Sequence, residues 1–303
     1  MEISSANKSL AIISHKYHIQ ADNGFVVKGG FQTLTDEIAR HFQTVDLCVP
    51  VASGNAENGR AYRDNIEVTP LPPFQGRKAL LSNLPEVLSI MWRVIRESDI
   101  AYCMGPNDVG VMAMAISKLQ GTKMFASIDT DRAYRVLQTE YNALEKQARY
   151  IVSKYIIYSL IRFLTKDVPV FVTGDMFMGQ YKPWKQWIKT TLRADEIPPK
   201  KRPDNPSEPF HVVFAGRLSP EKNLQRLIRS IDHLSGSGNP IYCTIVGSGR
   251  LRNKLEKTVE RLGAPIDFAG QIPNDELISS RFLGADLLTL PSKTGPIKHS
   301  IRL

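Results

Sequence analysis

The 303-residue chain is long enough for two domains that each bury a core, and its 42% hydrophobic and 23% charged residues are typical of a globular protein. No apolar run reaches the ~18 residues of a membrane span and no secretory signal is evident, which excludes a membrane-spanning protein and predicts a cytoplasmic chain. The net charge of +9 predicts an anionic partner, which could be a nucleotide, a nucleic acid or an anionic membrane surface. Cys48, Cys103 and Cys243 lie far apart in apolar runs, so neither a disulfide framework nor a zinc site is expected.

Apolar, strand-like runs alternate with amphipathic helical stretches, which predicts an α/β fold with mainly parallel sheets. The first domain is expected over residues 1–200. Its predicted strands lie near 9–14, 45–50, 66–71, 99–103, 122–128 and 168–173, and its predicted helices near 30–42, 78–97, 107–119 and 132–164.

Adjacent glycines stand between the first predicted strand and the first predicted helix. In Lys28-Gly29-Gly30-Phe31 they let the backbone approach a ligand closely and present N–H groups at the helix start. A flexible turn is the alternative interpretation of Gly29 and Gly30.

Two acidic residues follow predicted strands, where the ligands of α/β sheets bind. Asp108 follows the strand near 99–103 and could serve in a site or cap the next helix. Asp129 follows the strand near 122–128, and its carboxylate could accept a hydroxyl hydrogen bond or act as a base. Asp129-Thr130-Asp131 also fits an Asp-x-Asp metal pattern, but so short a pattern arises readily by chance and Asp131 could start a helix. We expect no metal site.

The helical stretch from Glu140 to Leu164 mixes apolar side chains such as Tyr155, Ile156 and Phe163 with several basic ones. Such a helix can cover a sheet or lie on an anionic bilayer. The first domain needs helices on both faces of its sheet, which favours covering the sheet, and peripheral contact with the inner face of a membrane stays open.

A proline-rich polar segment from Ile197 to Pro206 predicts a linker, set at residues 201–209. The second domain, residues 210–303, then offers strands near 211–216, 241–246, 266–269 and 286–290.

The strand near 211–216 leads into Gly216-Arg217-Leu218-Ser219-Pro220-Glu221-Lys222-Asn223. Gly216 permits a sharp turn, Ser219 suits an N-cap and Pro220 suits the first helical position. Arg217 and Lys222 beside free helical N–H groups would form a site for a di-anion such as a pyrophosphate. The alternative is a connection whose basic side chains face water.

These residues resemble the donor-binding half of the family 4 glycosyltransferases, which have the GT-B fold. Residues 216–223 match the family's Gly-Arg-Leu turn and Lys-Asn helix start, and 241–249 match its strand ending in Gly-x-Gly. Residues 266–270 and 285–292 match its next two strands. The resemblance implies an α/β protein of two Rossmann-like lobes and a retaining, metal-independent transfer of a sugar from a nucleoside diphosphate sugar.

The resemblance also implies roles for single residues. Donor binding falls on Gly216, Arg217, Lys222, Gly247 and Gly249, with Arg217 and Lys222 stabilising the leaving diphosphate. The acceptor cleft falls on Gly29, Gly30 and Asp108, and Asp129 stands where the family commonly has a histidine. The implied partners are the nucleotide-sugar donor and a glycan, lipid-linked or small-molecule acceptor. No cofactor is expected, and no nucleic acid because no binding motif is present.

The end of the chain departs from the family's pattern. After Pro291-Ser292 it lacks the two carboxylates that hold the donor in the family, so we expect a truncated, incomplete second lobe whose activity is uncertain. The alternative is a non-catalytic binding or interaction protein, whose strand near 286–290 would present an unpaired edge to a partner.

Overall fold

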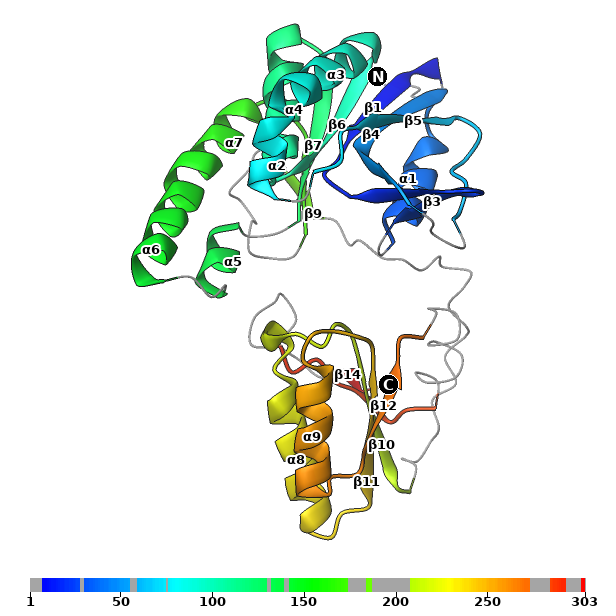
Figure 1. Cartoon of the computed structure of the whole chain (residues 1–303), viewed down its shortest axis with the longest axis vertical. Coiled ribbons are helices and arrows are strands. Elements are labelled where there is room, and N and C mark those ends of the chain that lie inside the picture. The colour runs from blue at the N-terminus through cyan, green and yellow to red at the C-terminus, as the bar shows by residue number, and fades with distance from the viewer. Residues whose placement is uncertain are drawn as a thin grey trace. The chain divides into compact units, whose positions relative to one another are not determined.

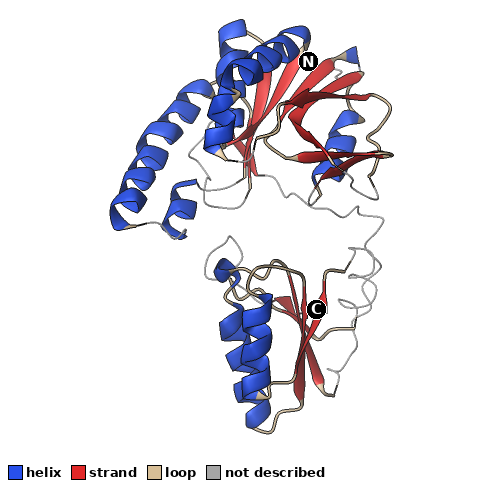
Figure 2. Cartoon of the chain, in the orientation of Figure 1, coloured by secondary structure: helices blue, strands red, loops and turns tan. Residues whose placement is uncertain are grey.

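The computed structural model describes residues 7–27, 30–54, 59–74, 76–129, 132–138, 142–173, 184–186, 208–272, 284–292 and 301–302. The chain forms two compact units, Met1–Thr191 and Leu192–Leu303 (Figure 1). Each unit combines a sheet with helices, as Figure 2 shows, so the predicted α/β fold is confirmed. Residues 201–207 of the predicted linker lie outside the described residues.

The first unit is built on a nine-stranded sheet in the order β3-β2-β4-β1-β6-β7-β8-β9, with β5 beside β4. Its parallel strands are β1 (Ser9–Ile13), β4 (Thr44–Ser53), β5 (Ile66–Leu71), β6 (Ile100–Gly105), β7 (Lys123–Ile128), β8 (Val170–Val172) and β9 (Trp184–Gln186). From β1, the chain adds β4 and β5 on one side and β6 to β9 on the other. This reversal is the topological switch point of a doubly wound sheet, and it lies between β1 and β6.

Alternate residues of β1 face opposite layers, as the two-residue period of a strand requires. Leu10 and Ile12 belong to the hydrophobic cluster that contains Phe31 of α1 (Phe31–Ala39). Ala11 and Ile13 belong to the cluster that contains residues of α3 (Leu84–Glu97) and α4 (Asp108–Gln120). The strand is therefore buried on both faces.

An antiparallel hairpin between the first strand and the first helix was not predicted. It consists of β2 (His18–Ala21) and β3 (Gly24–Val27). Gly24 has φ 128°, and a side chain there would overlap the backbone of Arg60, with which Phe25 forms a β-bridge. The stretch was missed because its four-residue strands are too short to show a clear period.

Two predicted helices are divided in the structure. The helix expected over 78–97 is α2 (Arg77–Ser82) and α3, separated at Asn83. Pro85 lies in the first turn of α3, the part of a helix that tolerates a residue without an N–H. The helix expected over 132–164 is α5 (Arg132–Gln138), then a continuous helix of α6 (Ala143–Ile151), the π-helical η2 (Val152–Ile157) and α7 (Tyr158–Leu164).

The second unit has a five-stranded sheet in the order β12-β11-β10-β13-β14. The strands are β10 (Phe210–Ala215), β11 (Ile241–Val246), β12 (Ile266–Gly270), β13 (Leu287–Leu288) and β14 (Ile301–Arg302), and the helices α8 (Leu224–Gly236) and α9 (Arg252–Leu262) pack side by side. The strand order again reverses, here between β10 and β13.

The expectation of an unpaired edge near 286–290 is wrong. β13 pairs in parallel with β10 on one side and antiparallel with β14 on the other. The end of the chain has no apolar period that would predict a strand, but Ile301 and Arg302 need only their backbone groups to pair with Leu288 and Leu287.

Candidate functional site

A hollow of about 720 Å³ lies at the switch point of the first unit, beyond the carboxyl ends of β1, β6 and β7. Four of its side chains are cationic (Lys16, Arg77, Arg132 and Arg149) and two are anionic (Asp108 and Asp129). The other lining residues are His15, Met104, Gly105, Pro106, Asn107, Val136, Ala148, Val152 and Ser153. Its composition suits a ligand that combines hydroxyl groups with negative charge.

The connection from β6 to α4 shapes one wall of this hollow. Asn107 caps the helix: its Oδ1 accepts the Gly110 N–H at 2.9 Å, and its Nδ2 donates to the Met104 carbonyl at 2.6 Å. A side chain at Gly110 would overlap the Met104 carbonyl, so the helix packs directly on the strand end. The cap is therefore Asn107, and the carboxylate of Asp108 is available to the hollow.

Asp108 holds two arginines at the hollow. Its carboxylate oxygens lie 3.0 Å from Arg77 Nε on α2 and 2.9 Å from Arg132 Nη1 on α5. Arg132 also donates to the Pro106 carbonyl at 3.1 Å. Three separate elements thus meet at one carboxylate, which fixes where both guanidinium groups lie.

Asp129 lines the same hollow from the end of β7. Its Oδ1 accepts a hydrogen bond from the Thr173 hydroxyl at 3.3 Å, beyond the end of β8. The structure therefore brings together two residues that were predicted separately, Asp108 and Asp129. Thr130 and Asp131 lie outside the described residues, and among the described residues no group of three or more His, Cys, Asp or Glu could hold a metal ion.

The two glycines expected beside this site, Gly29 and Gly30, have different outcomes. Gly29 lies outside the described residues, and Gly30 precedes α1, where its carbonyl accepts the Leu34 N–H at 3.1 Å. Gly30 is not among the described residues that line the hollow. Lys16, Arg77 and Arg132 were not singled out from the sequence, because only the folded chain brings these three distant residues to one edge of the sheet.

In the second unit, the loops that follow β10 and β11 are joined backbone to backbone. The Gly216 N–H donates to Val246 O at 3.0 Å, and the Leu218 N–H donates to Ser248 O at 2.9 Å. Side chains at Gly247 and Gly249 would overlap the carbonyl groups of Gly216 and Leu218. These glycines are therefore required by the packing of one loop on the other, whatever the loops bind.

Arg217 and Lys222 lie in this loop region, and the local helix differs from the prediction. Pro220–Lys222 form a 3-10 turn, Asn223 adopts a left-handed conformation with φ 54°, and α8 begins only at Leu224. No side-chain cap forms at Ser219, which donates to Glu221 Oε1 at 2.6 Å instead. The predicted helical turn thus begins at Pro220, but it is a 3-10 turn without the side-chain cap expected from Ser219.

Glu221 forms a long ion pair with the exposed Arg217. Arg217 Nη2 lies 3.8 Å from Glu221 Oε1, and 82% of the Arg217 side chain is exposed. Burial alone would raise the pKa of Glu221, but the Ser219 hydroxyl and the charges of Arg217 and Lys222 together hold it below its usual value. The ion pair of Arg217 within the described part of the chain is thus long, and Arg217 can reach an anion in solvent.

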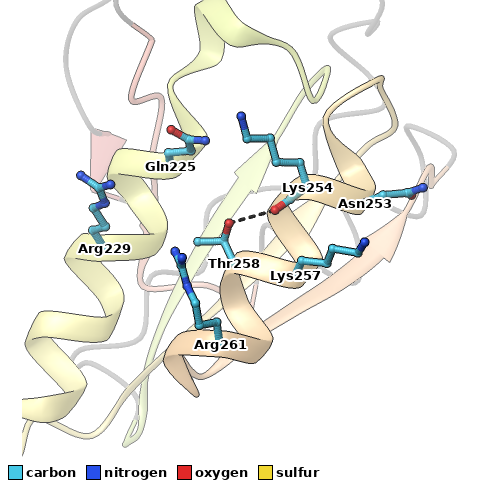
Figure 3. Close-up of a pocket in the computed structure, with 7 residues that line it drawn as sticks. All are labelled: Gln225, Arg229, Asn253, Lys254, Lys257, Thr258 and Arg261. Atoms are coloured by element: carbon cyan, nitrogen blue, oxygen red, sulfur yellow. Dashed lines mark hydrogen bonds between the residues drawn. The ribbon is translucent and has the colours of Figure 1, made fainter.

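A second hollow, of about 550 Å³, runs between α8 and α9 on their solvent side (Figure 3). It is lined by Gln225, Arg229, Asn253, Lys254, Lys257, Thr258 and Arg261. The core-facing side chains of these helices, such as Leu227 and Leu255, belong to the other side. None of the five residues predicted for donor binding lines this groove.

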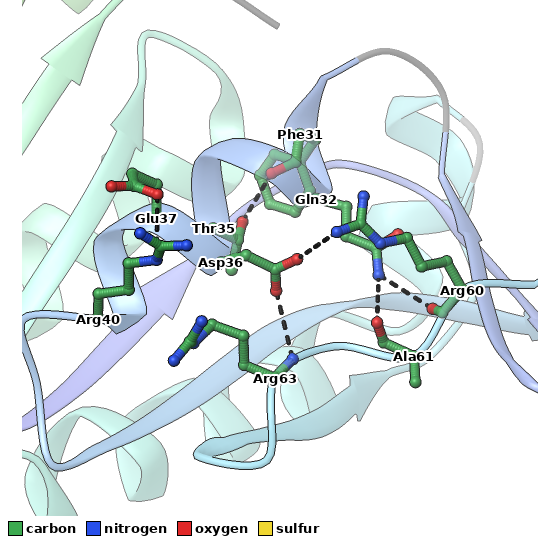
Figure 4. A network of polar contacts seen from close by, with 9 residues as sticks. All are labelled: Phe31, Gln32, Thr35, Asp36, Glu37, Arg40, Arg60, Ala61 and Arg63. Atoms are coloured by element: carbon green, nitrogen blue, oxygen red, sulfur yellow. Dashed lines mark hydrogen bonds and ion pairs between the residues drawn. The ribbon is translucent and has the colours of Figure 1, made fainter. Parts of the chain in front are cut away.

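Another basic cluster of the first unit has an internal role (Figure 4). Asp36 on α1 accepts the Arg63 N–H at 3.3 Å and pairs with Arg60 Nη2 at 3.4 Å. Gln32, one turn earlier, donates to the carbonyl groups of Arg60 and Ala61 at 3.0 and 2.9 Å. These contacts fasten the chain at 60–63 to α1, so this cluster is structural.

Comparison with known proteins bears on both units. Residues 196–299 match the family model described as Glycosyl transferases group 1. Along 95% of this chain, the fold matches that of HepE from Anabaena, solved in complex with UDP, at a TM-score of 0.58, 14% identity and 74% coverage of that chain. WaaG, a glycosyltransferase involved in lipopolysaccharide biosynthesis, matches over 95% of this chain and 76% of its own at a TM-score of 0.58 and 16% identity. This chain has the fold of the GT-B glycosyltransferases.

Short segments of this chain are similar in sequence to two enzymes of known activity. A 64-residue segment, 21% of the chain, is 39% identical to an alpha-1,4-N-acetyl-D-galactosaminyltransferase of Campylobacter jejuni that acts on a PP-undecaprenol-linked sugar, and covers 18% of that protein. An 80-residue segment, 26% of the chain, is 35% identical to the GDP-mannose-dependent alpha-(1-6)-phosphatidylinositol dimannoside mannosyltransferase of Mycobacterium tuberculosis, and covers 20% of it. The aligned segments thus span 18% and 20% of these relatives.

Proposed function

We propose that the chain transfers a sugar from a nucleoside diphosphate sugar to an acceptor. The observation that carries this proposal is the match of residues 196–299 to Glycosyl transferases group 1 within a chain that has the GT-B fold. The UDP in the related HepE structure supports a nucleotide donor. The proposal extends to retention of anomeric configuration, to a mechanism without a metal ion and to a cytoplasmic location.

The donor would bind at the joined loops of the second unit. Gly216, Gly247 and Gly249 keep side chains away from the carboxyl edge of the sheet, next to the switch point between β10 and β13. Arg217 and Lys222 would neutralise the charge that grows on the diphosphate as it leaves, which stabilises the transition state. Two cationic side chains can neutralise the leaving diphosphate without a metal ion.

The acceptor would bind in the hollow of the first unit. Asp129 is suited to accept a hydrogen bond from an acceptor hydroxyl or to remove its proton, and Asp108 would hold the two arginines that contact anionic groups. Gly29 and Gly30 remain part of the proposed acceptor side. Both relatives named above act on sugars attached to phosphate-bearing lipids, so we favour a lipid-linked acceptor over a free glycan or a small molecule.

Calorimetric titration with UDP, GDP and their sugar conjugates tests the donor site. Wild type is expected to bind at least one of them, and Arg217→Ala is expected to bind it about tenfold or more weakly because a charge-assisted contact to phosphate is lost. Arg261→Ala removes an exposed arginine of the same unit outside the proposed site and serves as the matched control. Equal affinities of Arg217→Ala and Arg261→Ala would remove the donor-site assignment.

A further inference from the structure

The groove between α8 and α9 is a positively charged surface to which the proposed function assigns no role. Gln225 and Arg229 stand on α8, and the other lining residues stand on α9 (Figure 3). No described acid lines the groove, and its four cations are Arg229, Lys254, Lys257 and Arg261. All four are exposed. The groove therefore presents one sign of charge to the solvent.

The cations of the groove are not neutralised from within the described part of the chain. None of the four forms an ion pair with a described residue, whereas Arg252 on the same helix pairs with Glu256, at 2.8 Å from Nε to Oε1. The acids of the two helices are Asp232, Glu256 and Glu260, and none of them lines the groove. The four charges are therefore available to an external anion.

The spacing of these cations opposes the stability of α9. Lys254 and Lys257 stand three residues apart, and Lys257 and Arg261 stand four residues apart, so like charges are neighbours on one face of the helix. Such neighbours destabilise a helix, and no described acid lies in the groove to offset them. A local arrangement that lowers stability without a compensating contact is typical of a functional surface.

The geometry of the groove suits a helix as its occupant. α8 and α9 run in the same direction, because each follows a strand of one parallel sheet. At a rise of about 1.5 Å per residue, Lys254, Lys257 and Arg261 are spaced about 4.5 and 6 Å along the axis of α9. Acids at positions i, i+3 and i+7 of another helix have the same spacing. Side chains on one face of an extended peptide repeat only about every 7 Å.

We propose that this groove binds a helix of a partner protein that carries a row of acidic side chains along one face. The carboxylates of that row would pair with the four cations, and the aliphatic stems of the lysines and arginines would pack along the helix. Gln225 and Asn253 add amide groups for hydrogen bonds at the rim. The surface lies apart from the proposed donor residues, so the partner and the nucleotide would not compete for the same side chains.

Two other anionic occupants fit this groove less well. Single-stranded nucleic acid binds largely through stacking on aromatic rings, and no described residue of the lining is aromatic. A bilayer takes up large apolar side chains, and the described lining has none. No helix in the described part of the chain is long and apolar enough to cross a membrane.

Fluorescence anisotropy with a labelled probe peptide tests the proposal on the full chain. The probe is an alanine- and glutamine-based helical peptide of about 20 residues with its glutamates on one face, and its isomer distributes the same glutamates around the helix. At low ionic strength, wild type is expected to bind the probe about tenfold more tightly than the isomer, and added salt is expected to weaken binding. Lys257→Gln/Arg261→Gln is expected to bind the probe about tenfold more weakly than wild type does.

The matched control is Arg96→Gln/Lys123→Gln, which removes two exposed positive charges from the first unit and is expected to bind the probe as wild type does. Thermal unfolding checks the fold of both variants. Because Lys257→Gln/Arg261→Gln removes a like-charge pair, it is expected to unfold at the temperature of wild type or slightly above it. Its loss of binding would then not reflect a loss of folding.

Three outcomes would overturn the proposal. Equal affinities of wild type for the probe and the isomer would refute a helical partner, and equal losses in the groove and control variants would refute the groove. A single-stranded oligonucleotide that binds more tightly than the probe, and is lost in the groove variant, would assign the groove to nucleic acid. Calorimetry with UDP is an independent readout: probe binding without UDP binding would refute the donor site and leave the groove proposal standing.

Discussion

Arg132 and Arg77 are held in place by the same carboxylate, that of Asp108, at 2.9 and 3.0 Å. The two arginines come from α5 and α2, and Asp108 opens α4 at the switch point of the sheet. Asp108 therefore acts on a ligand chiefly through the arginines that it orients. It is a positioning residue, and the guanidinium groups are the candidates for direct contact.

We expect Asp108→Asn to release both arginines while the Asn107 cap of α4 stays intact. The pairs are partly exposed, so the loss in the free energy of unfolding should be only about 1 kcal/mol, which lowers Tm by about 2–4 °C. Thermal unfolding measures this effect. Once an acceptor is known, a rise in its KM without a matching fall in kcat would distinguish lost positioning from lost chemistry.

A matched control for that variant is Glu86→Gln, which removes an acid from the first turn of α3, outside the described lining of the hollow. It is expected to leave acceptor KM unchanged. The positioning role is wrong if both variants change acceptor KM equally, because a general loss of negative charge would then explain the effect.

Gly247→Ala is expected to destabilise the second unit by about 2–4 kcal/mol. Gly247 has φ 131°, and an added Cβ would overlap the carbonyl of Gly216 in the neighbouring loop, so both the conformation and the packing oppose it. Urea unfolding followed by circular dichroism measures the change. Gly236→Ala, which adds a methyl group to open space at the end of α8, is expected to change stability by no more than a few tenths of a kcal/mol.

Most strands could be predicted from the sequence because those of a parallel sheet are continuous apolar runs. Ala11 and Ile13 of β1 are buried on one face while Leu10 and Ile12 are buried on the other, so residues 10–13 form an unbroken apolar run. The hairpin of β2 and β3 was missed for the opposite reason. Its residues alternate weakly, and the bridge between Phe25 and Arg60 that supports it joins distant parts of the chain.

The candidate site was predictable only in part. Asp108 and Asp129 could be proposed because each follows a strand, and strand ends of a parallel sheet converge. Arg77 and Arg132 stand on helices whose placement depends on tertiary packing, and no local pattern distinguishes them from solvent-facing arginines. The helix start at Pro220 was predicted from cap chemistry that is sound locally, but Ser219 bonds Glu221 and the left-handed Asn223 delays the helix.

Asp46→Asn is expected to stabilise the protein at neutral pH. Burial raises the pKa of Asp46 on β4, and no described residue donates a hydrogen bond to its buried Oδ1, so its charged form opposes folding. Because the folded-state pKa is raised, wild type gains stability as the pH falls through that value. The advantage of Asp46→Asn should therefore be largest at neutral pH and shrink toward pH 4.

Chemical unfolding across this pH range measures the difference for Asp46→Asn. Asp267→Asn changes an exposed aspartate on strand β12 and is expected to have no such pH-dependent advantage. An advantage of Asp46→Asn that stays constant down to pH 4 would contradict the assignment, since it would then not arise from the ionised carboxylate.

Asp286→Ala is expected to loosen the strand β13 that completes the switch point of the second unit. Asp286 Oδ2 accepts the His211 backbone N–H at 2.7 Å, and His211 in turn bonds the Thr244 hydroxyl at 2.9 Å, so one buried cluster ties β13 to β10 and β11. Removing the carboxylate leaves a buried N–H without its acceptor, which should cost about 1–3 kcal/mol.

Hydrogen exchange should accelerate at Thr289, whose N–H bonds Val213 O at 2.9 Å, more than at Thr244 in the middle of β11. Asp286→Asn keeps an oxygen acceptor and is expected to recover most of the protection. Equal exchange in all three proteins would mean that the strand pairing of β13 holds it in place without the Asp286 carboxylate.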